Sequence, residues 1–365
     1  MQAIYIIGDG CAGLSLAARA RDLPDHQLTL IVPEGAPPPQ EHIWGFWRLP
    51  GLDAAVGLAH QAWETWRIVT EETSAELASS NHPYHALYRS RWEAHCRTRA
   101  EEAGVRTISQ KETIVDPSAQ ILDSRPSPIS HGQLMQHFIG WEVTVESGTF
   151  DPSMATLMDF RCDQSRGIHF IYVLPFSDTE ALVESTMFSS QRAPDDFFET
   201  AISTYLQEHH GQNEYSVTRV ENGAIPMGRL RPSPSPAMGL GGNGGAIKPS
   251  SGYAFAFVQK QIAAAIASTS NHTNGIKIRP PHKMIDLWMD DVFVTVMREW
   301  PAAAPNIFMR MARGLTGDEF ALFLSGEATW PMRLKVIFAM PKWIFLRSFI
   351  HHLFGRDAAR LKSGS

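Results

Sequence analysis

The sequence predicts an α/β protein built from three kinds of segment. The N-terminus reads as a β-strand, a glycine-rich turn and an alanine-rich helix, whereas the middle of the chain alternates apolar and polar residues as antiparallel strands do. The last quarter has apolar residues at helical spacing. Because the chain has 365 residues and a typical domain about 150, we expect more than one structural unit.

Composition excludes two classes of protein. Hydrophobic residues make up 44% of the chain and charged residues 19%, so the chain has enough apolar surface to fold and is not disordered. The net charge of -6 leaves no basic excess to neutralise phosphates, so we expect no nucleic-acid partner.

Cysteine usage and hydropathy indicate the compartment. Cys11, Cys96 and Cys162 form no CxxC pair, which argues against a disulfide framework or a zinc site and favours a reducing cytosol. The chain opens on an apolar strand without a basic leader, and no run of about 18 uncharged apolar residues occurs. We therefore expect neither secretion nor a transmembrane helix.

The N-terminal segment carries a glycine motif in the context that the motif requires. Ala3–Ile7 predicts a strand, residues 8–13 form a GxGxxG turn, a helix follows, and Leu28–Val32 predicts a second, parallel strand. A strand, turn and helix in this order are typical of a Rossmann-type dinucleotide-binding site, although a merely structural turn is the alternative.

Each residue of the turn has an expected role. Gly8 permits the tight turn, Gly10 lets backbone amides approach a pyrophosphate, and Gly13 lets the helix pack on the strand. Cys11 and Ala12 lie between these glycines at the start of the helix, so we count them among the cofactor-binding residues.

Two details depart from the usual motif. Asp9 places a carboxylate beside the expected phosphate site, and Val32 stands at the end of the second strand where an acid usually holds the ribose hydroxyls. Glu34, two residues further on, is the candidate substitute.

A second glycine cluster, Gly239–Tyr253, leads into another alanine-rich helix. A flexible linker is the alternative, but a linker would not lead directly into a strong helix. Two such loops, about 230 residues apart, suit FAD better than NAD, with one loop at the pyrophosphate and the other at the flavin end. The expected binding residues here are Gly241, Gly242, Gly245, Pro249 and Gly252.

These patterns divide the chain. Residues 1–125 and 236–275 form a discontinuous FAD-binding domain, 126–235 an inserted antiparallel sheet that binds substrate, and 276–365 a helical C-terminal region. Ile43–Trp47 reads as an aromatic cluster in an irregular segment. Helices are expected at 91–103, 195–210 and 255–267.

Seven blocks along nearly the whole chain, in the same order, resemble the flavin-dependent lycopene cyclases of bacteria and plants. The blocks are Gly10–Ala17, Trp44–Trp47, Gln136–Val143, Leu157–Arg161, Tyr172–Pro175, Ile225–Met227 and Lys248–Tyr253. The resemblance implies that the acyclic ends of lycopene are cyclised to β-ionone rings, a non-redox isomerisation in carotenoid biosynthesis. It also implies reduced FAD as cofactor and NAD(P)H as reductant.

The resemblance assigns the general acid to Glu184, with Ser185 in place of a second acid often found beside it. Adjacent strand residues face opposite sides, so only one of the two can point into a pocket. An apolar site would keep the Glu184 carboxyl protonated, and Leu182, Val183 and Met187 are consistent with such a site. A solvent-facing glutamate is the alternative.

The matching blocks suggest further site residues. His137, Asp159 and Arg161 are expected to line or support the cavity, although Asp159 and Arg161 can simply pair with each other. Arg89 is a weaker match to an arginine near the cofactor. Aromatic faces expected to stabilise a cation are Trp44, Phe46 and Trp141.

The C-terminus suggests contact with a membrane surface. Residues 332–365 carry seven basic residues against one acid, a balance of +6, and Trp343–Phe354 has an apolar helical face. A core helix is the alternative. We expect a cytoplasmic protein that associates peripherally with membranes.

The sequence leaves three alternative functions open. One is an FAD-dependent monooxygenase resembling aromatic hydroxylases, and a non-catalytic carotenoid-binding protein is more distant. A cyclase of another polyprenyl chain is also compatible with Ser185. The sequence does not determine the oligomeric state, the ring type or the number of ends cyclised.

Overall fold

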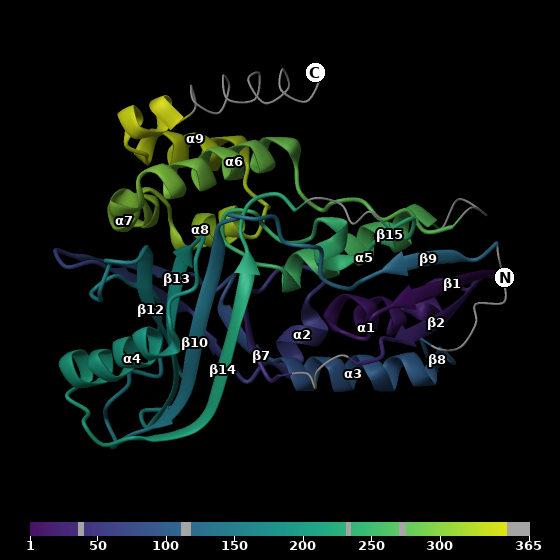
Figure 1. Cartoon of the computed structure of the whole chain (residues 1–365), viewed down its shortest axis with the longest axis horizontal. Coiled ribbons are helices and arrows are strands. Elements are labelled where there is room, and N and C mark those ends of the chain that lie inside the picture. The colour runs from purple at the N-terminus through teal and green to yellow at the C-terminus, as the bar shows by residue number, and fades with distance from the viewer. Residues whose placement is uncertain (36–39, 111–117, 231–234, 270–274, 349–365) are drawn as a thin grey trace.

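Two large sheets and a group of C-terminal helices make up the molecule (Figure 1). The structure, a computed structural model, describes residues 1–35, 40–110, 118–230, 235–269 and 275–348. The fold is α/β, as the sequence predicts.

The first sheet is the parallel sheet expected from the N-terminal motif. Its five strands lie in the order β15-β9-β1-β2-β8, and every neighbouring pair is parallel. Helices α1 (Cys11–Ala17), α3 (Arg89–Glu102) and α5 (Phe255–Thr269) pack together with it in one apolar core. The strands are β1 (Gln2–Ile7), β2 (His26–Val32), β8 (Arg106–Ser109), β9 (Gln120–Asp123) and β15 (Met238–Gly239).

The second sheet has seven strands in the order β14-β10-β13-β12-β11-β5-β6. All neighbours are antiparallel except β11 and β5, which run parallel. Its strands are β5 (Thr65–Val69), β6 (Ser74–Ala78), β10 (Met135–Thr144), β11 (Met154–Asp159), β12 (Ile168–Pro175), β13 (Glu180–Ser189) and β14 (Ser216–Pro226).

The predicted limits of this sheet, residues 126–235, are too narrow. Strands β5 and β6 come from the segment 1–125 and extend the sheet beyond β11. Local pattern cannot reveal this extension, because β5 and β11 pair across about 90 residues of chain.

A third, small sheet corrects a second expectation. Ile43–Trp47 is not irregular but forms β3, which pairs with β7 (Tyr84–Tyr88), and β7 pairs in turn with β4 (Gln61–Trp63). Each strand is short, so the local signal is weak, and long-range pairing decides the conformation. The short helix α2 (Asp53–Leu58) follows β3.

The two faces of the seven-stranded sheet have different covers. Helix α4 (Asp195–His210) packs on one face through a core that includes Ile139, Val183 and Phe198. Leu182 and Leu174 belong to the core of the other face, which the C-terminal helices share. These helices are α6 (Met284–Glu299), α7 (Ala304–Gly314), α8 (Gly317–Leu324) and α9 (Trp330–Ala339).

Two of the basic residues near the C-terminus form ion pairs with carboxylates inside the protein. Arg333 of α9 makes two hydrogen bonds, of 2.7 and 3.0 Å, to the carboxylate of Asp286 in α6, and both residues are buried. Lys335 pairs with Glu319 nearer the surface. Two of the predicted cations are therefore already paired within the protein.

The ion pair between α6 and α9 yields a stability prediction. Arg333→Met would leave Asp286 buried without its partner, and removal of one partner of a buried pair costs about 3–5 kcal/mol. Lys335→Met, on the same helix, removes an exposed pair worth about 1 kcal/mol or less. Thermal unfolding should show a large fall in midpoint for the first variant and a small one for the second. Equal effects would contradict the prediction.

Candidate active site

Four residues form a row across four strands of the seven-stranded sheet. Gly140 of β10 lies opposite Glu184 of β13 on one side and opposite Glu221 of β14 on the other. Tyr172 of β12 lies opposite Glu184 in turn. Directly opposed residues share one face of a sheet, so both carboxyl groups and the tyrosine ring project from the same side.

Gly140 is the reason that the two carboxyl side chains can approach each other. A Cβ added there would lie 3.1 Å from Cγ of Glu221, 3.4 Å from Cβ of Glu184 and 3.0 Å from Cδ1 of Leu182. Any larger side chain would occupy the space between the two glutamates. The row therefore requires the smallest residue at its centre.

Glu184 is a buried carboxyl on the apolar face of the sheet. Its exposed fraction is 9%, and the Thr186 hydroxyl donates a hydrogen bond to Oε1. Burial raises the pKa of Glu184 above its usual range, the Glu221 carboxylate raises it further, and the Thr186 hydroxyl lowers it in part. The alternative of a solvent-facing glutamate is therefore wrong, and burial favours the protonated form of Glu184.

Glu221 is more deeply buried, with 2% exposure, but it has cationic support. The backbone N–H of Ile43 and Nη1 of Arg219 both donate to its Oε2, at 3.0 and 3.1 Å. Burial raises the pKa of Glu221, and the Arg219 guanidinium opposes this shift. Arg219 also binds Glu142, which accepts a hydrogen bond from Tyr88.

Three tyrosine hydroxyls meet beside this row. The hydroxyl of Tyr84 lies 2.9 Å from that of Tyr172 and 3.5 Å from that of Tyr253. Burial raises the pKa of each well above its usual range, so all three stay neutral donors and acceptors. Gly45 provides the space, because a Cβ there would lie 1.9 Å from the Tyr84 oxygen.

Trp47 of strand β3 packs against this tyrosine cluster. The aromatic residues expected from the sequence to stabilise a cation do not. The Trp47 ring centroid is 4.8 Å from that of Tyr84 and 5.3 Å from that of Tyr253. Trp44 and Phe46, on the opposite side of β3, pack against Phe255 of α5.

Trp141 is also separated from Glu184. It contacts the core beneath α4 and lies near Tyr215, with ring centroids 6.1 Å apart. The three aromatic residues named from sequence thus do not line the Glu184 site.

The other predicted polar residues lie on the α4 face, opposite Glu184. Asp159 pairs with Arg161 at 2.6 Å and accepts a hydrogen bond of 2.9 Å from Tyr205 of α4. Burial raises the pKa of Asp159, but the hydrogen bonds from Arg161 outweigh it and lower the pKa overall. His137 lies opposite Met187, a member of the core under α4, and burial lowers the pKa of its ring. The sheet itself separates these residues from Glu184, so the prediction that they share its cavity is corrected.

Ser185 follows the strand alternation expected from the sequence. Its hydroxyl lies 2.7 Å from Nε2 of His169 on the α4 face, so it cannot reach the space that Glu184 faces. A second acid at this position would point under α4 as well.

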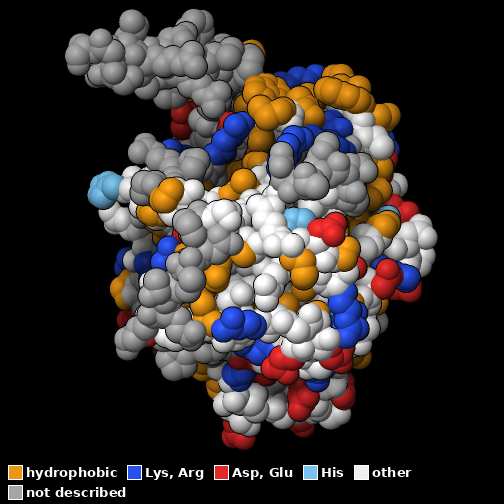
Figure 2. Space-filling model, turned by 90° about the vertical axis from the view of Figure 1, so that its right-hand side faces the viewer, with side chains coloured by type: hydrophobic (Ala, Val, Ile, Leu, Met, Phe, Trp, Pro, Cys, Tyr) orange, Lys and Arg blue, Asp and Glu red, His pale blue; other side chains and the backbone are white. Residues whose placement is uncertain are grey.

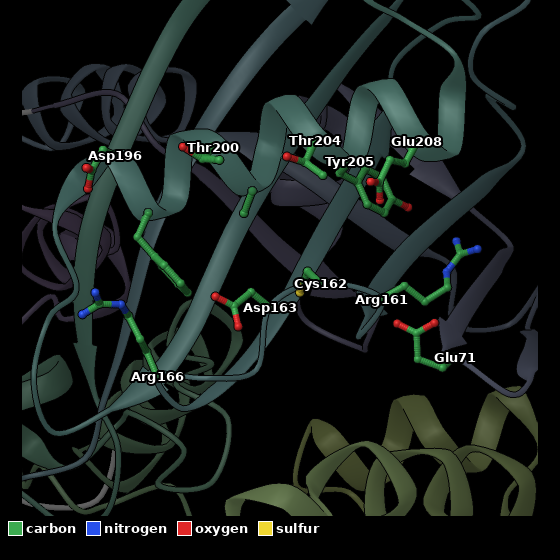
Figure 3. Close-up of a pocket in the computed structure, with 12 residues that line it drawn as sticks. Glu71, Arg161, Cys162, Asp163, Arg166, Asp196, Thr200, Thr204, Tyr205 and Glu208 are labelled. Atoms are coloured by element: carbon green, nitrogen blue, oxygen red, sulfur yellow. The ribbon is translucent and has the colours of Figure 1, made fainter.

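A pocket of about 510 Å³ opens beside α4 (Figure 3). In Figure 3, Asp196, Thr200 and Glu208 of α4 form one wall, and Arg161 and Asp163 lie across from them. Four acids and two arginines line it, which suits a polar ligand and not a polyene. This pocket and the Glu184 row occupy opposite faces of the sheet.

The N-terminal glycine turn has the geometry its motif predicts. Gly8 has φ +102°, and a Cβ on Gly13 would lie 2.0 Å from the Gly8 carbonyl oxygen. Among the residues that the structure describes, nothing lies within 4 Å of a Cβ on Gly10, which leaves that side of the turn open to a ligand. Asp9 is neutralised by Arg97 of α3, at 3.0 Å, which removes the objection raised by its charge.

The second glycine loop joins the first turn to the carboxyl row. A Cβ on Gly241 would lie 2.4 Å from Cβ of Ala12, so the two loops touch at the start of α1. At its other end, a Cβ on Gly252 would lie 2.9 Å from Ile225 of β14, and Tyr253 completes the tyrosine cluster.

The remaining residues of this loop lie between those contacts. The Pro249 carbonyl accepts a hydrogen bond from Gly228 at 2.7 Å, Gly242 lies against Ile247, and Gly245 adopts φ +77°. The linker alternative is wrong, because the loop is packed along its length.

Two predicted cofactor residues lie near the first turn. Glu34 follows β2, at the same edge of the parallel sheet as the turn, and accepts a hydrogen bond of 2.9 Å from Ser109. Arg89, at the start of α3, pairs with Glu93 at 2.7 Å. Burial raises the pKa of the Cys11 thiol, and the nearby Arg89 charge opposes it.

Comparison with known proteins identifies the family. The model of the family described as "Lycopene cyclase protein" matches residues 3–349. The chain belongs to the lycopene cyclase family. It is 25% identical over 268 residues to a lycopene beta-cyclase of Pantoea ananas, covering 67% of each chain. It is 24% identical over 293 residues to the lycopene beta-cyclase of Pseudescherichia vulneris, covering 74% of each.

Solved structures agree on the fold. A geranylgeranyl bacteriochlorophyll reductase-like protein of Thermoplasma acidophilum superposes with TM-score 0.59 at 13% identity, covering 95% of this lycopene cyclase family member and 98% of that chain. A flavin-dependent halogenase of Xanthomonas campestris gives TM-score 0.53 at 12% identity, covering 91% and 82%.

The sequence did not point to Glu221 or Tyr84 as site residues of this lycopene cyclase family member. Glu221 lies four residues before the Ile225–Met227 block and carries no motif of its own. Gly140, Tyr172 and Tyr253 lie within blocks that resemble the family, but their approach depends on strand register. Register is a long-range property that local pattern does not report.

Proposed function

We propose that this protein cyclises the acyclic ends of lycopene, or of a related polyene, to β-ionone rings with no net redox change. The observation that carries the proposal is a buried carboxyl, Glu184, on an apolar, aromatic-lined face of the sheet, where burial raises its pKa and favours the protonated form. Membership of the lycopene cyclase family supports the substrate class.

Glu184 serves as general acid in the proposed mechanism. Its proton passes to the terminal trisubstituted alkene, and the electron pair of the O–H bond stays on the carboxylate. The tertiary cation is attacked by the neighbouring double bond, which closes the ring, and the ring cation then loses a proton to give the endocyclic alkene. Substrate and product have equal mass.

The residues around Glu184 suit a cationic intermediate. The rings of Trp47, Tyr84 and Tyr253 pack together at tilted and edge-on angles, and an aromatic face attracts a cation by about 0.5–2 kcal/mol. The apolar surroundings exclude water, so each electrostatic interaction is stronger than in solution.

FAD is the proposed cofactor, and the residues present fit it. The open side of Gly10 and the touching loops at Ala12 and Gly241 would hold the pyrophosphate, while Pro249 and Gly252 would hold the flavin end beside the Glu184 row. In its reduced form, with NAD(P)H as the source of electrons, FAD supplies negative charge that stabilises a carbocation. Glu34, at the end of β2, is the candidate ribose ligand.

A monooxygenase is the second candidate. A 2-methyl-3-hydroxypyridine-5-carboxylic acid oxygenase superposes with TM-score 0.54 at 13% identity, which supports a shared fold alone. The two functions differ in product mass, because oxygenation adds one oxygen atom and cyclisation adds none.

We also propose that the C-terminal helices dock on a membrane surface, from which a polyene would be taken. Figure 2 shows hydrophobic side chains gathered among lysines and arginines at the top of the molecule, where Figure 1 places α6 and α9. Trp330, Phe338 and Trp343 are 60%, 69% and 72% exposed. Basic residues beside apolar ones are typical of surfaces that bind anionic lipid.

The described part of the expected C-terminal helix has one buried and one exposed side. Residues 342–348 are helical, with Ile344 and Phe345 packed on the core and Trp343 and Leu346 exposed. The rest of the predicted helix, 349–354, lies outside the described residues. In the chain segments that the structure describes, no helix is long and apolar enough to cross a membrane.

Loss of flavin binding tests the cofactor. Gly10→Glu would fill the open side of the turn with a carboxylate where a pyrophosphate must approach, so flavin uptake should be abolished. Gly57→Ala is the control and should bind flavin normally, because a Cβ there also meets no described part of the chain within 4 Å. Flavin absorbance of the purified variants measures both. Normal absorbance in Gly10→Glu would refute the assignment.

Vesicle binding tests the docking surface. Replacing Trp330, Phe338 and Trp343 with serine should weaken binding to anionic vesicles at least about tenfold, because burial of each aromatic side chain contributes about 1.5–3 kcal/mol. Binding of the native chain should fall as salt rises. Val217→Ser with Val220→Ser, on exposed β14, is the matched control and should bind normally. Equal binding by both variants would contradict the proposal.

Replacement of the acid tests the reaction. Glu184→Gln keeps the side-chain shape but removes the proton, so cyclisation should slow by at least about 10²- to 10⁴-fold while flavin binding and folding persist. Ser185→Ala, which faces α4, should cost little. Product analysis in a lycopene-accumulating host measures both. Near-normal cyclisation by Glu184→Gln would remove Glu184 from the role, and a product heavier by one oxygen would establish the monooxygenase.

A further inference from the structure

Glu184 and Glu221 have the geometry of a carboxyl pair and not of two separate acids. They lie in register on either side of Gly140, whose missing side chain leaves the space between them open. The Glu221 carboxylate raises the pKa of Glu184, as a neighbouring acid does. Two buried carboxylates on either side of one glycine would repel each other strongly, so the pair favours a single negative charge.

The surroundings of the pair are asymmetric. Glu221 receives the Ile43 N–H and the Arg219 guanidinium on one oxygen, whereas Glu184 receives a hydrogen bond from the neutral Thr186 hydroxyl. Cationic support favours the ionised form, so the negative charge belongs on Glu221 and the proton on Glu184. The other titratable groups that face the pair are Glu142, beside Arg219, and the neutral hydroxyls of Tyr84, Tyr172 and Tyr253.

We infer that Glu221 is a second functional residue of the acid centre, which shares one proton with Glu184 across Gly140 and drives the return of that proton at the end of the reaction. The inference rests on the proposed function. Once Glu184 has given its proton to the alkene, two carboxylates face each other in a buried site. Their repulsion favours recovery of a proton when the C–H bond of the ring cation breaks and its electron pair forms the new double bond. The pair thereby returns to one proton and one charge.

This arrangement predicts how the pH dependence changes in variants. The Glu221 charge opposes ionisation of Glu184, so its removal lets Glu184 lose its proton at lower pH. In Glu221→Gln, the alkaline limb of kcat/KM should therefore move to lower pH by at least about one unit. Glu180→Gln is the matched control: it removes an exposed carboxylate from the same strand as Glu184 but not from the pair, so the limb should stay in place.

Infrared spectroscopy reports the protonation of the carboxyl pair without requiring turnover. The infrared C=O stretch of a protonated carboxyl should be present in the native protein at neutral pH and absent in Glu184→Gln. In Glu221→Gln, this band should disappear at a lower pH than in the native protein. Gly140→Ala, which places a Cβ 3.1 Å from Cγ of Glu221, should separate the carboxyls and shift the band in the same direction if Glu221→Gln does not fold.

The outcomes distinguish the shared proton of Glu184 and Glu221 from the proposed cyclase function. A shift of both the limb and the band to lower pH supports the shared proton. An unchanged limb and band in Glu221→Gln, with Glu184→Gln inactive, would overturn the role of Glu221 and leave the cyclase function standing. Active Glu184→Gln would overturn the proposed function and the pair together.

Discussion

A buried ion pair between Lys248 and Asp290 holds the second glycine loop, Gly239–Tyr253, which contacts both large sheets and helix α6. Nζ of Lys248 lies 2.7 Å from Oδ1 of Asp290 in α6, and the Ser250 hydroxyl donates to the same oxygen at 2.6 Å. Breaking such a pair costs about 3–5 kcal/mol, because the remaining charge stays buried. The same loop touches α1 through Gly241 and β14 through Gly252. It therefore holds the parallel sheet, the antiparallel sheet and the C-terminal helices in one arrangement.

Glycine allows close packing at three positions between the N-terminal turn and Glu184. Gly241 permits contact with Ala12, Gly45 leaves room for the Tyr84 hydroxyl, and Gly140 lets the two glutamates approach each other. At each position an added Cβ would lie closer than 3.2 Å to another side chain. Close approach of backbone and side chains, and not flexibility, explains these residues. Substitution at any of them would change the distance between functional groups before it changed their chemistry.

The two faces of the seven-stranded sheet divide apolar from polar chemistry. Glu184 and the tyrosines share the face whose core extends to the C-terminal helices, whereas Asp159, Arg161 and the polar pocket lie under α4. This division follows from strand geometry, because the side chains of successive residues on a strand point to opposite faces of the sheet. Ser185 follows the same rule, so the loss of an acid at that position does not alter the face that carries the proposed reaction.

The sequence by itself determined the α/β class, the N-terminal glycine turn, the helices α3, α4 and α5, and Glu184 as the candidate acid. These depend on short-range patterns: periodicity, glycine spacing and ordered motif blocks. Tertiary structure decided what depends on long-range pairing. It made Ile43–Trp47 a strand, extended the second sheet by β5 and β6, and paired Asp9 with Arg97.

Tertiary structure also decided which polar residues belong with Glu184. Strand register placed Glu221 beside it, and placed Asp159, Arg161 and His137 behind the sheet. A shift of one residue in register would exchange the two faces, and nothing local to Glu221 reports its partner two strands away. The candidate acid was therefore readable from the chain alone, whereas its neighbours in the sheet depended on how the strands pair.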